Sequence, residues 1–338
     1  MGKFPYTFPN RINMAYTNEP TLIKYNDGFD AVVGSNYSYY TVAETDAHEG
    51  PVYFHDTNEL YFTSNRMDSN IPNVNSYKVA IRKIELSNDN KVVTVAEPSN
   101  MANGMTMDMD HQLVICEQGS MTQRARISQY NRQTGEFSNI VDSWFGLTFN
   151  SPNDVVVKRD GTVWFTDPAY GHAQGFKPEP LVGNFVYRFD PSTGETTVVA
   201  DNFIRPNGLA FSADQTQLYI NDSGALLGDS DEYHVDLPHH IKVYDILDDR
   251  NLANERLFAV VTPGIPDGLK VDTEDRVYSS CATGVKVYSQ EGVLLGEILA
   301  EGVANFTFGG PKNNILYMCT DTAVVAAQLA AVGANQYL

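Results

Sequence analysis

The chain has 338 residues, of which 42% are hydrophobic and 19% charged, and its formal net charge is -19. This composition is typical of a globular protein rather than a disordered one. The negative charge repels phosphate backbones and anionic membranes, so we expect neither nucleic acid nor a membrane as a partner. A neutral or cationic small molecule, or a bound cation, fits this charge better.

The start of the chain and its cysteines bear on where the protein resides. The first residues, 1–6, lack the apolar core of a signal peptide, and no apolar run reaches the roughly 18 residues of a transmembrane helix. Cys116, Cys281 and Cys319 are too few and too widely spaced for a disulfide framework. We therefore expect the cytoplasm, while a mature secreted form that has lost its signal stays open. The sequence predicts no oligomeric state.

Residues 1–47 precede any repeat, and within this N-terminal segment Tyr39–Ala43 has the composition of a β-strand. Residues 48–338 then repeat one pattern six times: an oxygen-bearing side chain, a β-type run, a polar turn and a second β-type run centred on Tyr, Trp or Val. The spacing of about 40 to 60 residues is typical of propeller blades with four strands. We predict an all-β fold, a six-bladed β-propeller forming a single domain over residues 1–338. The residues that open the repeats, here called the ring residues, are Glu49, Asn103, Asn153, Asn207, Asp267 and Asn305.

The last repeat has only 34 residues from Asn305 to the end of the chain, too few for a complete blade. We expect Ala323–Leu329 to be its final strand rather than a helix. The strand at Tyr39–Ala43 would then complete this blade and close the ring, which removes exposed sheet edges.

The start of one antiparallel strand and the end of the next lie at the same edge of a hairpin. If the first strand of each repeat is the innermost, the ring residues converge on one mouth of the channel. The carboxylates that close the second strands, Glu117, Asp167 and Asp222, would surround them. Two carboxylates and four amides make a hard-oxygen site, which favours one Ca²⁺ ion over zinc or copper, although other divalent ions would also fit. The alternative is that Asn and Asp before Gly are ordinary turn residues.

At these positions the chain resembles the gluconolactonase and senescence-marker-protein (regucalcin) family, and within it the fungal lactonohydrolases. The most specific stretches are Ser151–Val157, Trp164–Gly171, Arg205–Phe211 and Ile265–Leu269. The resemblance implies a six-bladed propeller with one catalytic calcium. Its metal ligands would be Glu49, Asn153, Asn207 and Asp267, and Asp267 would also be the general base.

The expected reaction is the hydrolysis of a lactone or similar cyclic ester, in which a metal-polarised carbonyl is attacked by water and Asp267 takes the proton. Four residues are expected to contact the substrate: Asn103, Asn305, His48 and Tyr170. The sequence does not define the role of His48 or of the long segments 171–183 and 224–240. It also contains no G-x-S-x-G motif of a serine hydrolase.

Other functions remain open at this stage. A similar ring could serve a metal-dependent phosphotriesterase or a biosynthetic enzyme that rearranges a natural product without hydrolysis. A non-catalytic binding propeller with a structural calcium is the alternative from a different class. The fold alone cannot separate these, because one fold hosts many chemistries.

Overall fold

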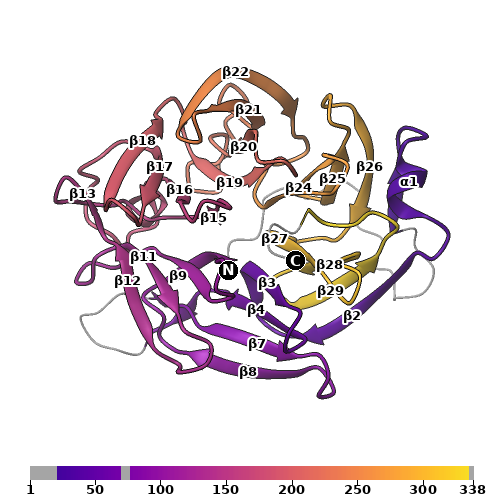
Figure 1. Cartoon of the computed structure of the whole chain (residues 1–338), viewed down its shortest axis with the longest axis horizontal. Coiled ribbons are helices and arrows are strands. Elements are labelled where there is room, and N and C mark those ends of the chain that lie inside the picture. The colour runs from indigo at the N-terminus through magenta and orange to yellow at the C-terminus, as the bar shows by residue number, and fades with distance from the viewer. Residues whose placement is uncertain (1–20, 70–76, 335–338) are drawn as a thin grey trace.

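Six antiparallel sheets of four or five strands stand around a central channel in the computed structural model of the chain, which describes residues 21–69 and 77–334 (Figure 1). The predicted six-bladed β-propeller is therefore confirmed. Of the predicted N-terminal segment 1–47, residues 1–20 lie outside the described residues. No helix within the described ranges is long and apolar enough to span a membrane.

In blades one to five, four strands follow one another in chain order from the centre outward, with the first strand innermost. Blades one to three are β3 (Ala47–Phe54), β4 (Glu59–Ser64), β7 (Ile81–Glu85) and β8 (Lys91–Ala96); β9 (Ala102–Met107), β10 (Leu113–Glu117), β11 (Arg126–Tyr130) and β12 (Phe137–Val141); and β15 (Val155–Val157), β16 (Val163–Asp167), β17 (Phe185–Asp190) and β18 (Glu195–Ala200). Blades four and five are β19 (Pro206–Phe211), β20 (Gln217–Asp222), β21 (His240–Leu247) and β22 (Asn251–Val260); and β23 (Leu269–Val271), β24 (Val277–Cys281), β25 (Gly284–Tyr288) and β26 (Leu294–Leu299).

The last blade joins the two ends of the described chain. It consists of β27 (Asn305–Gly309), β28 (Ile315–Cys319), β29 (Ala323–Gln328) and β2 (Ser38–Glu44). β2 runs antiparallel to β29, with Thr41 opposite Val325. The structure thus confirms both the final strand and the closing strand that the sequence predicts.

Several short elements were not predicted. β1 (Leu22–Lys24) adds a fifth strand to blade five by pairing with β26, and α1 (Phe29–Val33) follows it. Two short hairpins, β5 (Met67–Asp68) with β6 (Tyr77–Lys78) and β13 (Ser143–Trp144) with β14 (Leu147–Thr148), and the helix α2 (Tyr170–Ala173) lie outside the blades.

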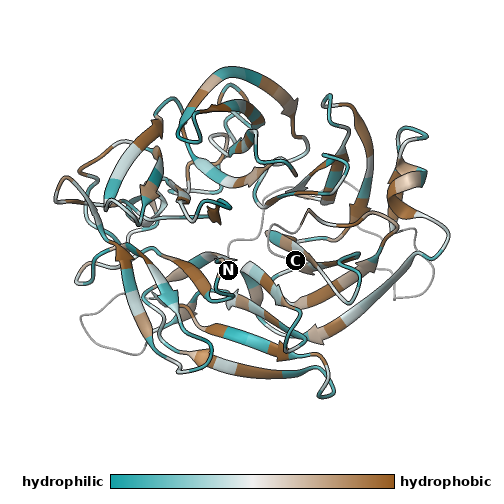
Figure 2. Ribbon diagram, viewed as in Figure 1, coloured by the Kyte–Doolittle hydropathy of each residue, from teal (hydrophilic) through white to brown (hydrophobic). Residues whose placement is uncertain are grey.

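The turn between the first two strands of every blade contains a residue with positive φ, which reverses the chain tightly. These residues are Asn58, His111, Gly161, Gln215, Asp275 and Asn313. Figure 2 shows hydrophobic colour concentrated in the strands and hydrophilic colour in many connecting loops. These turns therefore fix where the inner hairpins end. They thereby also fix the position of the ring residues along the channel.

The hydrophobic core lies between the blades. Each of six buried clusters joins two neighbouring blades, so that together they cover all six interfaces. Between blades five and six, for example, Tyr278 packs edge-on against Phe308, at 5.1 Å between ring centroids. Burying a side chain of this size contributes about 1.5–3 kcal/mol. The interfaces fix the blades against one another and so hold the inner strands, which carry the ring residues, in place.

Candidate functional site

The ring residues lie at one end of the central channel, linked from blade to blade by hydrogen bonds. The main-chain N–H of Gly104 and the side-chain amide of Asn103 both donate to the carbonyl oxygen of Asn153, at 2.8 and 3.2 Å. The hydroxyl of Thr166 donates to the carbonyl oxygen of Asn207 at 2.9 Å. Blades two, three and four are thus joined at the level of the ring.

The same linkage continues through the remaining blades. The N–H of Gly208 donates to the carbonyl oxygen of Asp267 at 3.1 Å. The side-chain amide of Asn305 donates to Oε2 of Glu49 at 2.8 Å and closes the circle between the last blade and the first. The structure therefore brings all six ring residues together, as the repeat predicts.

The glycines that follow several ring residues allow this close approach. A Cβ atom on Gly208 would lie 2.1 Å from the carbonyl oxygen of Asp267, and one on Gly268 would lie 2.4 Å from Oδ1 of Asn305. Real Cβ atoms do not come this near. Asn207-Gly208 lies inside the innermost strand β19 rather than in a turn, so this pair serves the packing of inner strands.

The two ring carboxylates lie buried or half-buried and close to each other. Oε2 of Glu49 accepts hydrogen bonds from the N–H of Gly50 and from Asn305, while Oε1 has no hydrogen-bond partner among the described residues. Burial, followed by the negative charge of Asp267, raises the pKa of Glu49. Burial also raises the pKa of Asp267, the hydrogen bond from Asn207 opposes this, and the charge of Asp154 adds to it. A cation between the two carboxylates would remove this cost.

One buried amide oxygen of the ring has no hydrogen-bond partner in the part of the chain that the structure describes. Oδ1 of Asn153 is buried and accepts no hydrogen bond from the described residues, which is uncommon for a buried polar atom. The described residues contain no group of three or more His, Cys, Asp or Glu side chains placed to hold a metal ion. The other ligands of an ion in this ring would therefore be amide oxygens, and such a donor set fits calcium.

Asp154 is a third buried carboxylate that the sequence analysis missed. It occupies the position after Asn153, where four of the other five repeats have glycine and the last has Phe306. It is 2% exposed, and its Oδ2 has no hydrogen-bond partner among the described residues. Burial raises its pKa, and the positive charge of Lys270, on β23, opposes that shift. The signal available in the sequence was a carboxylate at a repeat position that is mostly glycine.

The carboxylates of Asp167 and Asp222 support the ring from the outside. Asp167 accepts from the N–H groups of Asn150 and Ser151, both at 2.8 Å, which lie three and two residues before Asn153. Asp222 makes the equivalent bonds, at 3.0 and 2.9 Å, to the residues three and two before the ring residue of blade four. Burial raises the pKa of Asp167 to about 7. Both residues fix the loop that leads into a ring residue.

Glu117 plays a different part. Its carboxylate pairs with Arg126 at 2.7 Å and accepts from the hydroxyl of Ser128 at 2.5 Å and the amide of Asn100 at 2.8 Å. Asn100 lies three residues before the ring residue Asn103, so Glu117 also holds the approach to the ring. Its acceptor sites are already occupied within blade two.

His48 and Asp321 form a hydrogen-bonded pair beside the ring. Nδ1 of His48 lies 2.7 Å from Oδ1 of Asp321, and 40% of the His48 side chain is exposed. The pairing of β3 with β4 is irregular on both sides of Glu49, so His48 and Glu49 do not simply face opposite sides of a regular strand. Burial lowers the pKa of His48, but the hydrogen bond to Asp321 and the negative charges of Asp321 and Glu49 together outweigh it, and the net pKa is raised. This leaves Nε2 as the free nitrogen of the imidazole among the described residues.

Tyr170 begins α2 and is 8% exposed. Burial and then the charge of Asp267 raise the pKa of its hydroxyl, while the charge of Arg205 opposes the shift. The aromatic ring of Tyr170 faces the guanidinium of Arg205, whose Cζ lies 5.5 Å from the ring centroid.

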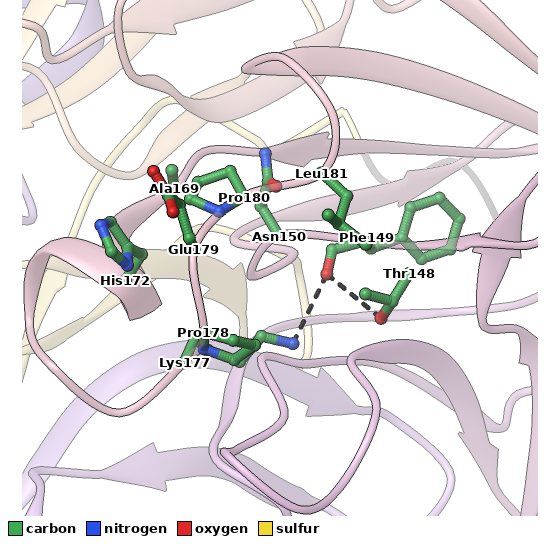
Figure 3. Close-up of a pocket in the computed structure, with 10 residues that line it drawn as sticks. All are labelled: Thr148, Phe149, Asn150, Ala169, His172, Lys177, Pro178, Glu179, Pro180 and Leu181. Atoms are coloured by element: carbon green, nitrogen blue, oxygen red, sulfur yellow. Dashed lines mark hydrogen bonds between the residues drawn. The ribbon is translucent and has the colours of Figure 1, made fainter.

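Two cavities accompany the site. One of about 110 Å³ follows the inner strands away from the ring; its lining includes Tyr53, Met105 and Phe211, with Lys270 as its charged residue. The other, of about 10 Å³, lies beside the mouth between Phe149, His172 and the segment 177–181 (Figure 3). There Nζ of Lys177 donates to the carbonyl oxygen of Phe149 at 3.4 Å, and burial lowers its pKa to about 8. The second cavity has room for about one water.

Known proteins share both the sequence pattern and the fold. The family described as SMP-30/Gluconolactonase/LRE-like region matches residues 47–322. Lactonohydrolase oryL of Aspergillus oryzae is 29% identical over 89% of the chain and 72% of its own length, and the gluconolactonase of Zymomonas mobilis is 29% identical over 69% of the chain and 64% of its own length. The solved structure of a gluconolactonase from Xanthomonas campestris has a TM-score of 0.75 at 27% identity, over 91% of this chain and 94% of its own. These relatives support lactone hydrolysis as the type of activity. The chain belongs to the SMP-30/gluconolactonase/LRE-like family.

Proposed function

We propose that this protein is a calcium-dependent hydrolase that opens a lactone or a similar cyclic ester at the ring. The observation that carries the proposal is the buried Oδ1 of Asn153, which has no partner among the described residues and lies in a ring with two carboxylates of raised pKa. Both features are costly in the protein alone and would be relieved by a cation.

Glu49, Asn153, Asn207 and Asp267 would hold the ion. A bound calcium would supply a Lewis acid that polarises the lactone carbonyl and stabilises negative charge on its oxygen. Zinc fits less well, because its usual ligands are Cys and His.

The side chains of the mouth would transfer the proton and contact the substrate. Asp267 would take the proton of the attacking water as the general base. Asn103, His48 and Tyr170 would contact the substrate, with His48 oriented by its hydrogen bond to Asp321. Asn305 donates to Glu49 and its Oδ1 accepts from the N–H of Phe306, so we assign it the positioning of Glu49.

An assay of acid release from a panel of γ- and δ-lactones, with and without chelator, tests this function. We expect turnover that chelator abolishes and calcium restores. Turnover of phosphotriesters alone would identify a phosphotriesterase instead. If chelator lowers the melting temperature but no lactone is hydrolysed, the remaining functions are a binding protein with a structural ion and an enzyme with a non-hydrolytic reaction.

We further propose that the protein works in the cytoplasm as a single domain. All three cysteines are buried and unpaired, which suits a reducing compartment. Titration of the protein purified from its own cells should find three free thiols after denaturation. A disulfide, or two separate unfolding transitions, would contradict this part of the account.

A further inference from the structure

Two arginines at the mouth, Arg66 and Arg205, have no carboxylate partner within residues 21–69 and 77–334, although the chain contains 42 acidic residues. Among the described residues, every arginine forms an ion pair except Arg66, Arg159 and Arg205. Arg159 lies in the turn between β15 and β16, at the opposite end of the blade from the ring, where it donates to the carbonyl oxygen of Ala213. Arg66 and Arg205 are therefore the two unpaired arginines at the end of the propeller that carries the ring residues, and a function of the mouth would explain them.

Arg205 is held in place by backbone and by an aromatic ring. It lies two residues before Asn207, and its guanidinium donates from Nε to the carbonyl oxygen of Leu227 at 2.9 Å and from Nη1 to that of Ile204 at 3.1 Å. Its Cζ lies 5.5 Å from the centre of the Tyr170 ring. These contacts fix the guanidinium without neutralising it, and they leave Nη2 without a partner among the described residues.

Tyr170 connects this guanidinium to the ring. The N–H of Gly171, the residue after Tyr170, donates to Oγ of Ser151 at 2.8 Å. Ser151 lies two residues before the ring residue Asn153, so this contact places Tyr170 beside the ring. A Cβ atom on Gly228 would come within 2.7 Å of the Tyr170 ring, which shows how closely the segment 224–240 packs on it. A ligand whose carbonyl lies at the ring would thus extend past Tyr170 toward Arg205.

Arg66 contacts the other end of the segment that begins at Tyr170. Its Nη1 donates to Oε1 of Gln174 at 2.8 Å, just after α2, and its positive charge lowers the pKa of His48. The guanidinium groups of Arg66 and Arg205 therefore flank the segment Tyr170–Gln174, one from blade one and the other from blade four.

We propose that Arg205, assisted by Arg66, forms an anion-binding subsite that selects lactones bearing a carboxylate. This deepens the proposed function and rests on it. A guanidinium binds a carboxylate through two parallel N–H donors, and a site in a strongly acidic protein needs such local positive charge to admit an anion. The subsite reverses the expectation from net charge alone, which favours a neutral or cationic substrate.

Two matched probes test the subsite: the γ-lactone 5-oxotetrahydrofuran-2-carboxylate and its primary carboxamide, assayed with the calcium-loaded full chain. The wild type should have the higher kcat/KM on the carboxylate. Arg205→Gln should lower the ratio of carboxylate to carboxamide kcat/KM by about 10- to 100-fold, the range expected for a charge-assisted hydrogen bond, and Arg66→Gln by less. Arg159→Gln removes the same charge far from the mouth and should leave the ratio unchanged.

The outcomes separate this inference from the proposed function. Calcium-dependent hydrolysis of both probes with no preference, or a preference that Arg205→Gln retains, would overturn the subsite but keep the lactonase. If neither probe is opened, calorimetric titration with the carboxylate probe decides. The subsite is supported if the wild type binds this probe and Arg205→Gln does not. It is overturned if both proteins bind the probe equally or neither binds it. A melting temperature of Arg205→Gln close to that of the wild type shows that the variant folds.

Discussion

The side-chain amide of Asn305 donates a hydrogen bond of 2.8 Å to Oε2 of Glu49, although the two residues are 256 positions apart. This bond joins the innermost strands of the last and first blades at the level of the ring. It occupies Oε2 of Glu49, while Oε1 has no hydrogen-bond partner among the described residues. This contact between the first and last blades thus also orients the carboxylate of Glu49, which is a ligand of the ion in our proposal.

Replacement of Asn305 by alanine should therefore weaken calcium binding. Loss of a group that orients a metal ligand typically lowers affinity by about 10- to 100-fold, and we expect a value in this range for Asn305→Ala. Calorimetric titration of calcium into metal-free protein measures it. Asn139→Ala, at an exposed position of β12, is the control. Affinity within twofold of the wild type for Asn305→Ala would show that the bond does not orient Glu49.

The stabilisation by calcium should grow with pH. The pKa values of Glu49 and Asp267 are raised in the folded protein above their ordinary values of 4.5 and 3.8, so the metal-free folded state binds more protons than the unfolded state. Their contribution to stability is present below about pH 4 and is lost as pH rises through the raised pKa values. In the proposed site, calcium would bind the deprotonated carboxylates and cancel this loss.

The difference in melting temperature between calcium-loaded and metal-free protein checks this at pH 5, 6.5 and 8. Other titrating groups contribute nearly equally to both forms and largely cancel in the difference. We expect the difference to increase at each step. A difference that stays constant or shrinks toward pH 8 would mean that the ion does not replace protons on these carboxylates.

Asp167→Ala should destabilise the protein strongly. It removes the acceptor for the N–H groups of Asn150 and Ser151, and buried donors left unsatisfied cost about 1–3 kcal/mol each. Urea unfolding should show a loss of about 3 kcal/mol, with a smaller loss for Asp167→Asn, which keeps one acceptor oxygen. The exposed Asp201, changed to alanine, is the control and should stay within about 0.5 kcal/mol of the wild type.

Asp267→Asn should separate binding from chemistry. The amide keeps an oxygen for the ion but cannot take a proton from water, so kcat on a lactone should fall by at least about 100-fold, as for other general bases. Calcium content by elemental analysis should largely remain. An Asp267→Asn variant that retains activity would assign the general base to another residue.

The repeat in the sequence predicts the propeller, the closing strand and the position of the ring, because each depends only on strand order and hairpin geometry. It does not predict the pair of His48 and Asp321, which lie 273 residues apart and meet through the contact of the first and last blades. The charge of Arg205 beside Tyr170 likewise depends on loop conformations that no periodicity encodes. Asp154 was overlooked because its position is glycine in four of the other five repeats, although its burial against the ring makes it part of the same charge cluster.

The central claim is that the ring binds one calcium ion that is required for lactone opening. The most direct measurement follows acid release from a hydrolysed lactone while calcium is added back to metal-free protein, with Asn153→Leu titrated in parallel. The account predicts no turnover without calcium, full activity at one ion per chain in the wild type, and neither tight binding nor restored activity in Asn153→Leu. Turnover that persists in the metal-free wild type, or calcium activation that Asn153→Leu retains in full, would contradict it.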